Sequence, residues 1–156
     1  MIKAIIFDVG GVYIQDSFKG LFRYFNRKDL SFLHKLYLGL RKVNPDVKSL
    51  ITNLKKRYKV AALSNTLKYF GELNKGIGLY DIFDDYVLSS DAGYIKPQKK
   101  VYEILLGRLK LKPEECVFID NIYIFLLPAK KMGMKTIYFK NFNQLAEELK
   151  KFGVKI

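Results

Sequence analysis

The chain has 156 residues, 49% hydrophobic and 15% aromatic, which is long and apolar enough to bury the core of one domain. The 28 Lys and Arg residues exceed the 15 Asp and Glu residues, and the net charge of +13 favours anionic partners. The longest apolar stretches, such as Ile122 to Ala129, fall well short of the ~20 residues of a membrane-spanning helix. A single cysteine, Cys116, excludes an internal disulfide. We therefore expect a cytoplasmic protein with no membrane span and no cleavable signal peptide.

Five short runs along the chain predict the strands of a sheet. Each run is continuously apolar, without the alternation of apolar and polar residues that marks a strand with one face in water. The runs are 4–7, 60–63, 86–88, 116–119 and 136–139. Continuous apolar runs are typical of strands that are covered on both faces.

Segments between these runs have the spacing of amphipathic helices. The clearest has apolar residues at 47, 50, 51 and 54, with Asn44 as predicted N-cap and Pro45 at the first helical position. Apolar stripes at 101–109 and 145–152 predict two more helices, the second closed by Gly153. Alternating strands and helices predict an α/β fold, a Rossmann-like parallel sheet of about five strands with helices on both faces.

The segment 14–43 interrupts this alternation. It is long for a connection between a strand and a helix, and it has its own leucine and aromatic residues. We predict that it is a short helical cap inserted into a core domain formed by 1–13 and 44–156. Inserts after a sheet strand commonly lie over the ligand crevice.

Polar residues follow several of the predicted strands at the point where each ends. They are Asp8 after the first strand, Ser64 and Asn65 after the second, and Asp120 and Asn121 after the fourth, with Lys96 in a loop before a helix. The carboxyl ends of parallel strands meet at one edge, so these side chains are expected to converge. Two carboxylates suit Mg²⁺, whereas a hydroxyl, an amide and an ammonium group suit phosphate. Gly10 and Gly11 allow the backbone to approach an anion closely.

The ordered motifs resemble those of the haloacid dehalogenase-like hydrolases. The four segments that carry the resemblance are Ile5-Ile6-Phe7-Asp8-Val9-Gly10-Gly11-Val12, Leu63-Ser64-Asn65-Thr66, Gly93-Tyr94-Ile95-Lys96-Pro97, and Val117-Phe118-Ile119-Asp120-Asn121. Four motifs in order are a much more specific signal than any one of them. The resemblance covers nearly the whole chain and is weakest between residues 14 and 43.

This resemblance implies a phosphatase with Asp8 as nucleophile, which forms an aspartyl-phosphate that water then hydrolyses. By similarity, Mg²⁺ is held by Asp8, the Gly10 carbonyl and Asp120, and Asn121 reaches it through water. Phosphate is bound by Ser64, Asn65, Lys96 and the backbone at Gly11, and Lys96 also compensates the negative charge. In isolation, Ser64 would be read as a helix N-cap and Lys96 as a solvated loop charge. The expected substrate is a small phosphorylated metabolite.

One catalytic residue of the family is missing. Family phosphatases usually have a second aspartate two residues after the nucleophile, where this chain has Gly10. A general acid or base contributes about 10²–10⁴ in rate, so turnover is expected to be slow or to need another acid. Tyr13, Asp16 and His34 are the candidates. An Asp-x-Gly-Gly variant of the motif occurs in family members regarded as phosphatases.

The segment after Asp120 also departs from the family. Asn121 is neutral where the family commonly has another acid, so weaker metal binding is expected. The apolar run 122–127 is either buried in the core or exposed for a partner chain, which predicts a homodimer through this segment or through the cap. Pro128 requires a helix that starts within one turn before it.

Three other functions compete with the phosphatase. One is a degenerate family member that binds phosphate, metal or a protein without turnover, as Gly10 and Asn121 suggest. Another is an aspartyl-nucleophile dehalogenase, which needs no Mg²⁺ and so leaves the metal-site pattern of Asp8 and Asp120 unexplained. A nucleic-acid ligand is not expected, because the net charge is its sole support and basic runs such as 55–57 suit solvated helix ends.

Overall fold

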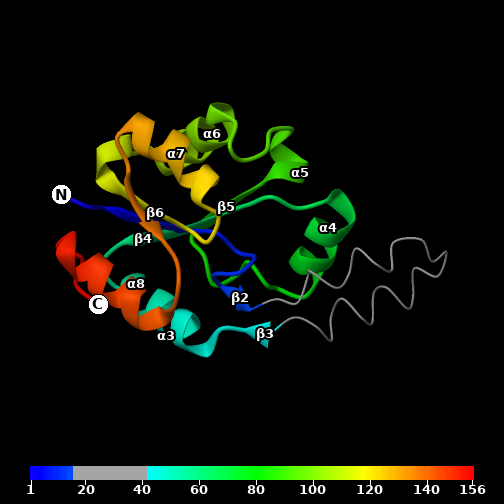
Figure 1. The fold of residues 1–156 in the computed structure, drawn as a ribbon. Coiled ribbons are helices and arrows are strands. Elements are labelled where there is room, and N and C mark those ends of the chain that lie inside the picture. Colours follow the sequence, from blue (N-terminus) through cyan, green and yellow to red (C-terminus); the bar gives the residue numbers. More distant parts are fainter. Residues whose placement is uncertain (16–41) are drawn as a thin grey trace.

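The computed structural model describes residues 1–15 and 42–156, which form a parallel sheet flanked by helices (Figure 1). Its strands, in the spatial order β5-β4-β1-β6-β7, are all parallel. In chain order they are β1 (Ala4–Phe7), β4 (Lys59–Ser64), β5 (Asp85–Leu88), β6 (Cys116–Asp120) and β7 (Lys135–Tyr138). Each predicted strand is confirmed to within one or two residues at its ends.

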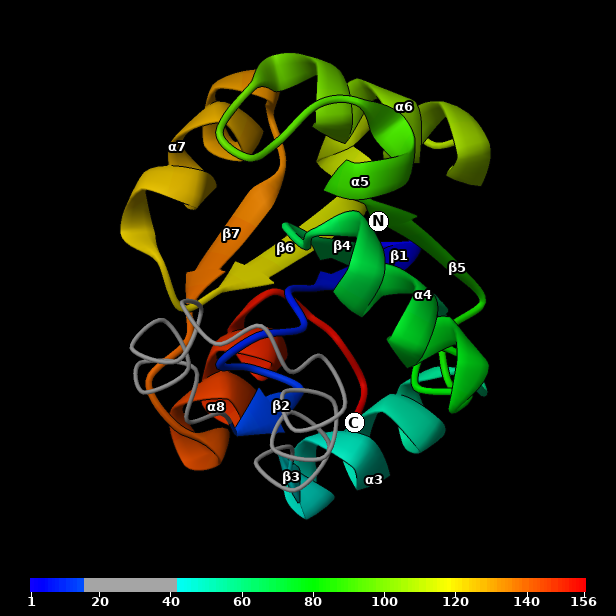
Figure 2. The same ribbon diagram turned by 90° about the vertical axis from the view of Figure 1, so that its right-hand side faces the viewer.

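Helices cover both faces of this sheet, as Figure 2 shows from the side. On one side lie α3 (Pro45–Leu54) and α8 (Phe142–Lys151), and on the other α6 (Lys99–Leu109) and α7 (Tyr123–Met132). The other helices of the described residues are α4 (Lys68–Gly76), the short α5 (Ser89–Ala92) and a 3₁₀ turn, Pro113–Glu115. The predicted Rossmann-like α/β fold is thereby confirmed.

The two faces of the sheet bury two separate apolar cores. Along β1, Ile5 and Phe7 point into the core under α3 and α8, whereas Ala4 and Ile6 point into the core under α6 and α7. None of these four residues is more than 1% exposed. Because successive strand residues face opposite sides, burial on both sides requires the continuous apolar runs seen in the sequence.

The helix-end signals in the sequence match the structure at two of three positions. The Asn44 side chain accepts hydrogen bonds from the backbone N–H groups of Asp46 and Val47, as an N-cap does. Gly153 has the predicted left-handed backbone, with φ of +75°. The prediction for Pro128 is wrong, because α7 begins at Tyr123 and Pro128 is its sixth residue. Only the hydrogen bond that its missing N–H would donate is lost.

The ends of the predicted cap segment pair with each other. Strand β2 (Ile14–Gln15) lies antiparallel to β3 (Lys42–Val43), and Ile14 is buried in the core under α3. The predicted helices between them fall outside the described residues, so the cap and its boundaries stay a prediction. Within residues 1–15 and 42–156, no helix has the length and apolar character needed to cross a membrane.

Candidate functional site

The three central strands bring the predicted acids to one edge of the sheet. Phe7 lies in register with Ala62 of β4 and with Ile119 of β6. The residue after each of these positions therefore lies at the same carboxyl edge, and the Asp8 N–H donates to the Ile119 carbonyl at 2.8 Å. This register places Asp8 and Asp120 side by side, as the sequence predicted.

Lys96 joins the two acids. Its Nζ lies 2.6 Å from Asp8 Oδ1 and 2.7 Å from Asp120 Oδ2, and it donates a third hydrogen bond to the Leu63 carbonyl at 3.0 Å. Lys96 is only 1% exposed and Asp120 is fully buried. Each proton of the ammonium group thus has an acceptor, which is the condition under which a buried cation is tolerated.

The Asn65 side chain orients Lys96 from the neighbouring loop. Its Oδ1 accepts from the Lys96 N–H at 2.8 Å, and its Nδ2 donates to the Lys96 carbonyl at 3.0 Å. These two bonds tie the loop after β4 to the loop before α6, 31 residues apart in the chain. The sequence pointed to Asn65 as a phosphate ligand and did not predict this positioning role.

Burial and neighbouring opposite charges shift the pKa values of Asp8 and Lys96 in opposite directions. Burial raises the pKa of Asp8 to about 6, since the lowering effect of Lys96 is partly offset by the negative charge of Asp120. For Lys96, burial by itself would lower the pKa, but Asp8 and Asp120 together hold that pKa above its ordinary value. Lys96 therefore stays charged, and Asp8 is a carboxylate at pH 7.

The loop after β1 packs closely against Asn121. Gly11 has φ of +86°, and a Cβ atom there would lie 2.1 Å from Asn121 Nδ2, so only glycine fits beside this side chain. Asn121 Oδ1 is buried and accepts no hydrogen bond, the one such side-chain atom among the described residues. An unpaired buried oxygen on the residue that follows Asp120 suits a cation ligand.

The oxygens at this edge fit a hard divalent cation. The described residues hold no cluster of three or more His, Cys, Asp or Glu side chains, so an ion here would need amide or backbone oxygens besides Asp8 and Asp120. Asn121 Oδ1 and the backbone of the exposed Gly10 are the candidates. An all-oxygen donor set of this kind is typical of Mg²⁺ sites.

Ser64 ends β4 at the same edge and is 6% exposed. It does not cap a helix, because the N-cap of α4 is Leu67. The loop between them is held by Ser89, whose Oγ accepts from the Thr66 N–H at 2.9 Å and donates to the Thr66 carbonyl at 3.1 Å. Ser89 is a supporting residue that sequence reasoning missed, because its partner is 23 residues away.

Two aromatic rings close to the Lys96 ammonium group account for its desolvation. Its Nζ lies 5.6 Å from the ring centroid of Phe118 and 5.1 Å from that of Phe125. The Tyr102 hydroxyl donates to the Phe125 carbonyl at 2.6 Å, which holds the start of α7 against α6. Neither Phe125 nor Tyr102 was among the predicted site residues.

Of the three candidates for the missing acid, Tyr13 is the one that the structure describes, and it gains little support. Tyr13 is 3% exposed, belongs to the core under α3, and packs edge-on against Phe83 at 5.2 Å between ring centroids. No hydrogen bond links its hydroxyl to Asp8, and burial raises its pKa, which disfavours the phenolate. Asp16 and His34 lie outside the described residues.

The apolar segment after Asp120 is largely exposed, one of the two alternatives that the sequence left open. Ile122, Tyr123, Ile124 and Leu127 are 38–63% exposed, and Leu126 alone is buried in the core under α7. A homodimer through this surface or through the cap stays a prediction.

Comparisons with known proteins agree with this architecture. A family model described as haloacid dehalogenase-like hydrolase matches residues 32–133. The glyceraldehyde 3-phosphate phosphatase of Methanothermobacter thermautotrophicus is 32% identical over 108 residues, which are 67% of this chain and 47% of that protein. Bifunctional epoxide hydrolase 2 of Mus musculus is 44% identical over 69 residues, 44% of this chain and 12% of that protein. The chain thus spans at most about half the length of these curated relatives.

Solved structures share the fold at low sequence identity. A HAD phosphatase from Thermococcus onnurineus superposes with a TM-score of 0.72 at 22% identity, covering 99% of each chain. A HAD family enzyme from Bacteroides thetaiotaomicron, crystallised with magnesium and inorganic phosphate, superposes with a TM-score of 0.74 at 18% identity, covering 90% of this chain and 95% of the other.

Proposed function

Because the chain belongs to the haloacid dehalogenase-like hydrolase family, we propose that it is a Mg²⁺-dependent phosphatase that uses Asp8 as its nucleophile. The observation that carries this proposal is the buried bridge from Lys96 to Asp8 and Asp120. Such a bridge is costly to bury, and replacing it by apolar residues would often stabilise a fold. Its presence at the carboxyl edge of a parallel sheet, where ligands bind in such folds, favours a role in chemistry.

Four groups would hold the metal: Asp8, Asp120, Asn121 Oδ1 and the Gly10 carbonyl. The bound ion supplies electrostatic neutralisation between the Asp8 carboxylate and an incoming phosphate dianion. The unpaired Asn121 oxygen supports this assignment, because burial without a donor is otherwise unfavourable. The relative crystallised with magnesium and inorganic phosphate supports the same metal.

The proposed reaction has two steps. An Asp8 oxygen attacks phosphorus, a new carboxylate oxygen–phosphorus bond forms, and the bond from phosphorus to the ester oxygen breaks. The leaving oxygen takes up a proton from water, because Gly10 has no side chain that could supply one. Water then attacks the aspartyl-phosphate, which releases inorganic phosphate and regenerates Asp8. Lys96 keeps Asp8 charged and in place, and Ser64 and the backbone at Gly11 bind the phosphoryl oxygens.

The missing second aspartate limits which esters turn over quickly. Gly10 is exposed and has no side chain to protonate the leaving oxygen. Esters whose leaving group is a weak base need this proton least, so an aryl phosphate should react faster than an alkyl phosphate. Among natural substrates we place small phosphorylated metabolites first, and glyceraldehyde 3-phosphate is the first to test because the archaeal relatives bear that name.

A second candidate function is phosphate or protein binding without turnover. It is supported by Gly10 in place of an acid and by the neutral Asn121. The two candidates share the same binding residues and differ only in whether the ester bond is broken.

The test is hydrolysis of 4-nitrophenyl phosphate and of glyceraldehyde 3-phosphate, with Mg²⁺ and with EDTA. We expect Mg²⁺-dependent release of phosphate that Asp8→Asn abolishes. The matched control Asp46→Asn, at an exposed carboxylate in the first turn of α3, should keep full activity. Equal rates for Asp8→Asn and the wild type would show a contaminating phosphatase and refute the mechanism. Phosphate binding without hydrolysis would select the second candidate.

A further inference from the structure

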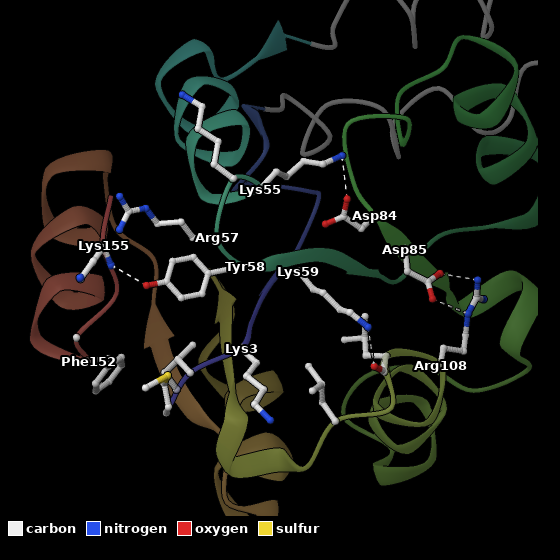
Figure 3. A pocket seen from close by; sticks show the side chains of 16 residues that line it. Lys3, Lys55, Arg57, Tyr58, Lys59, Asp84, Asp85, Arg108, Phe152 and Lys155 are labelled. Atoms are coloured by element: carbon white, nitrogen blue, oxygen red, sulfur yellow. Dashed lines mark hydrogen bonds and ion pairs between the residues drawn. The ribbon is translucent and has the colours of Figure 1, made fainter.

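A second concave surface lies at the opposite, amino edge of the sheet. It forms where β1 and β4 begin, and the ends of α3, α6 and α8 border it (Figure 3). Its volume is about 1340 Å³. We call it the amino-edge basin. Lys3 lies before β1 and Asp8 after it, so the basin is about 17 Å from the catalytic edge at ~3.3 Å per strand residue.

The basin carries a surplus of positive charge. Seven Lys and Arg residues line it, against the two carboxylates of Asp84 and Asp85. Lys55 pairs with Asp84 at 3.1 Å, Arg108 pairs with Asp85, and Lys3 pairs with Glu115 at 2.7 Å. These three ion pairs account for three of the seven cations.

Four cations have no carboxylate within 4.0 Å in the described part of the chain: Lys56, Arg57, Lys59 and Lys155. They come from the turn after α3, the start of β4 and the segment after α8. Lys59 Nζ donates only to the Leu109 carbonyl at 3.1 Å, and Lys56 Nζ only to Asn53 Oδ1 at 3.1 Å. Gathering unpaired like charges costs folding free energy, so the fold alone does not explain them.

Two aromatic rings lie among these charges. Tyr58 and Phe152 are half-buried, and both rings pack against the core under α3 and α8. The Tyr58 hydroxyl accepts from the Lys155 N–H at 2.9 Å, which fixes the ring beside the basic residues, as Figure 3 shows. Lys135 Nζ already lies 5.8 Å from the centroid of the Phe152 ring. The half-buried Tyr58 ring, held in this way, offers a stacking surface for a planar base.

We propose that the amino-edge basin binds single-stranded nucleic acid, with phosphates on the unpaired cations and a base stacked on Tyr58. Separate cations arranged around aromatic rings are how single strands are bound without sequence readout. The basin exceeds the usual ~300–1,000 Å³ of a small-molecule pocket. A duplex keeps its bases stacked inside and could use only the cations. An acidic peptide could use the cations but has no base to stack on the rings.

The first measurement is fluorescence anisotropy of a labelled twelve-residue oligothymidylate with wild-type protein over a range of salt. Four phosphate contacts predict a slope of about −3 for log K against log salt, since single strands release ~0.7 counterion per contact. Binding should therefore weaken about 50-fold between 50 and 200 mM salt. A slope near zero would overturn the proposal.

Two triple variants with equal loss of charge locate the site. Lys56→Gln/Arg57→Gln/Lys155→Gln removes three exposed cations of the basin, and Lys99→Gln/Lys130→Gln/Lys131→Gln removes three exposed cations on α6 and α7. We expect the first variant to lower the slope to about −1 and the second to bind almost as the wild type does. Equal weakening by both variants would mean diffuse attraction by net charge and would overturn the proposal. Neither triple variant should alter phosphatase turnover.

The ring contribution is tested with Tyr58→Leu against Tyr58→Phe. Tyr58→Leu should weaken oligonucleotide binding by about tenfold, whereas Tyr58→Phe keeps the ring and should bind normally. Unfolding curves of both variants verify that each is folded at the assay temperature. Competition completes the test: unlabelled duplex, a nucleoside triphosphate and polyglutamate should each displace the strand poorly. Displacement by any of them at the concentration at which unlabelled strand acts would overturn the proposal in favour of that ligand.

Discussion

Replacing Lys96 by Met should destabilise the protein far more than a usual lysine substitution. Lys96 is 1% exposed and donates three hydrogen bonds, two of them to carboxylates at 2.6 and 2.7 Å. Methionine is unbranched like lysine and only one atom shorter, but it leaves Asp8 and Asp120 buried without a counter-charge. Removing one partner of a buried ion pair costs about 3–5 kcal/mol, because an uncompensated charge remains. For a chain of this size that lowers Tm by about 10 °C or more.

The loss of stability in Lys96→Met should also depend on pH, and the raised pKa of Asp8 determines the direction of this dependence. Burial already raises the pKa of Asp8 to about 6 in the presence of Lys96, and removing the cation raises that pKa further. A carboxylate whose folded pKa lies above its unfolded pKa destabilises the folded state at high pH, and protonation relieves this as pH falls. The loss in Lys96→Met should therefore be greatest at pH 7 and above and should shrink toward pH 4.

Urea unfolding in EDTA at pH 7 and pH 4.5 measures both effects. Lys99→Met is the matched control, since Lys99 is 69% exposed and pairs with Glu103 only at the surface. Such surface pairs contribute about 0–1 kcal/mol, so the control should be close to wild type at both pH values. A Lys96→Met loss below about 1 kcal/mol at pH 7, or one that grows as pH falls, would refute the reasoning.

Three further predictions concern the same edge of the sheet. Gly11→Ala should lower the thermal unfolding temperature more than Gly93→Ala does. Both positions have positive φ, but only a Cβ atom at Gly11 collides with Asn121. Equal losses in the two variants would contradict the packing argument. Asp8→Asn in EDTA should raise the free energy of unfolding at pH 7 by up to about 3 kcal/mol. The reason is that the raised pKa of Asp8 makes the folded wild type lose stability as pH rises from about 4 to 6. At pH 4 the gain in Asp8→Asn should vanish. Asn121→Asp should tighten Mg²⁺ binding several-fold by calorimetry and weaken the metal-free fold, and unchanged affinity would place the ion away from Asn121.

Local patterns predicted most of the fold, because each one reports a contact made within a few residues. The strand β6 could be predicted from its apolar run, and the start of α3 from Asn44, since a cap bonds to backbone two and three residues away. The prediction for Pro128 was wrong because the free-energy cost of a proline in a helix depends on its distance from the helix start. That start, Tyr123 in α7, is not marked by a local pattern.

For the candidate site, the sequence by itself determined which residues end the central strands. Asp8 and Asp120 follow apolar runs, and parallel pairing places such residues at one edge whatever the connections are. The family motifs added Lys96, whose position in a loop gave no geometric reason to place it there.

The tertiary structure alone decided how those residues are held and what surrounds the amino edge. The clamp of Asn65 on Lys96 and the contact of Gly11 with Asn121 join segments that are distant in the chain. The surplus positive charge of the amino-edge basin likewise depends on which of its lysines form ion pairs with carboxylates from distant segments. Short-range patterns cannot encode these contacts, because each depends on two segments whose separation is set only when the whole sheet is assembled.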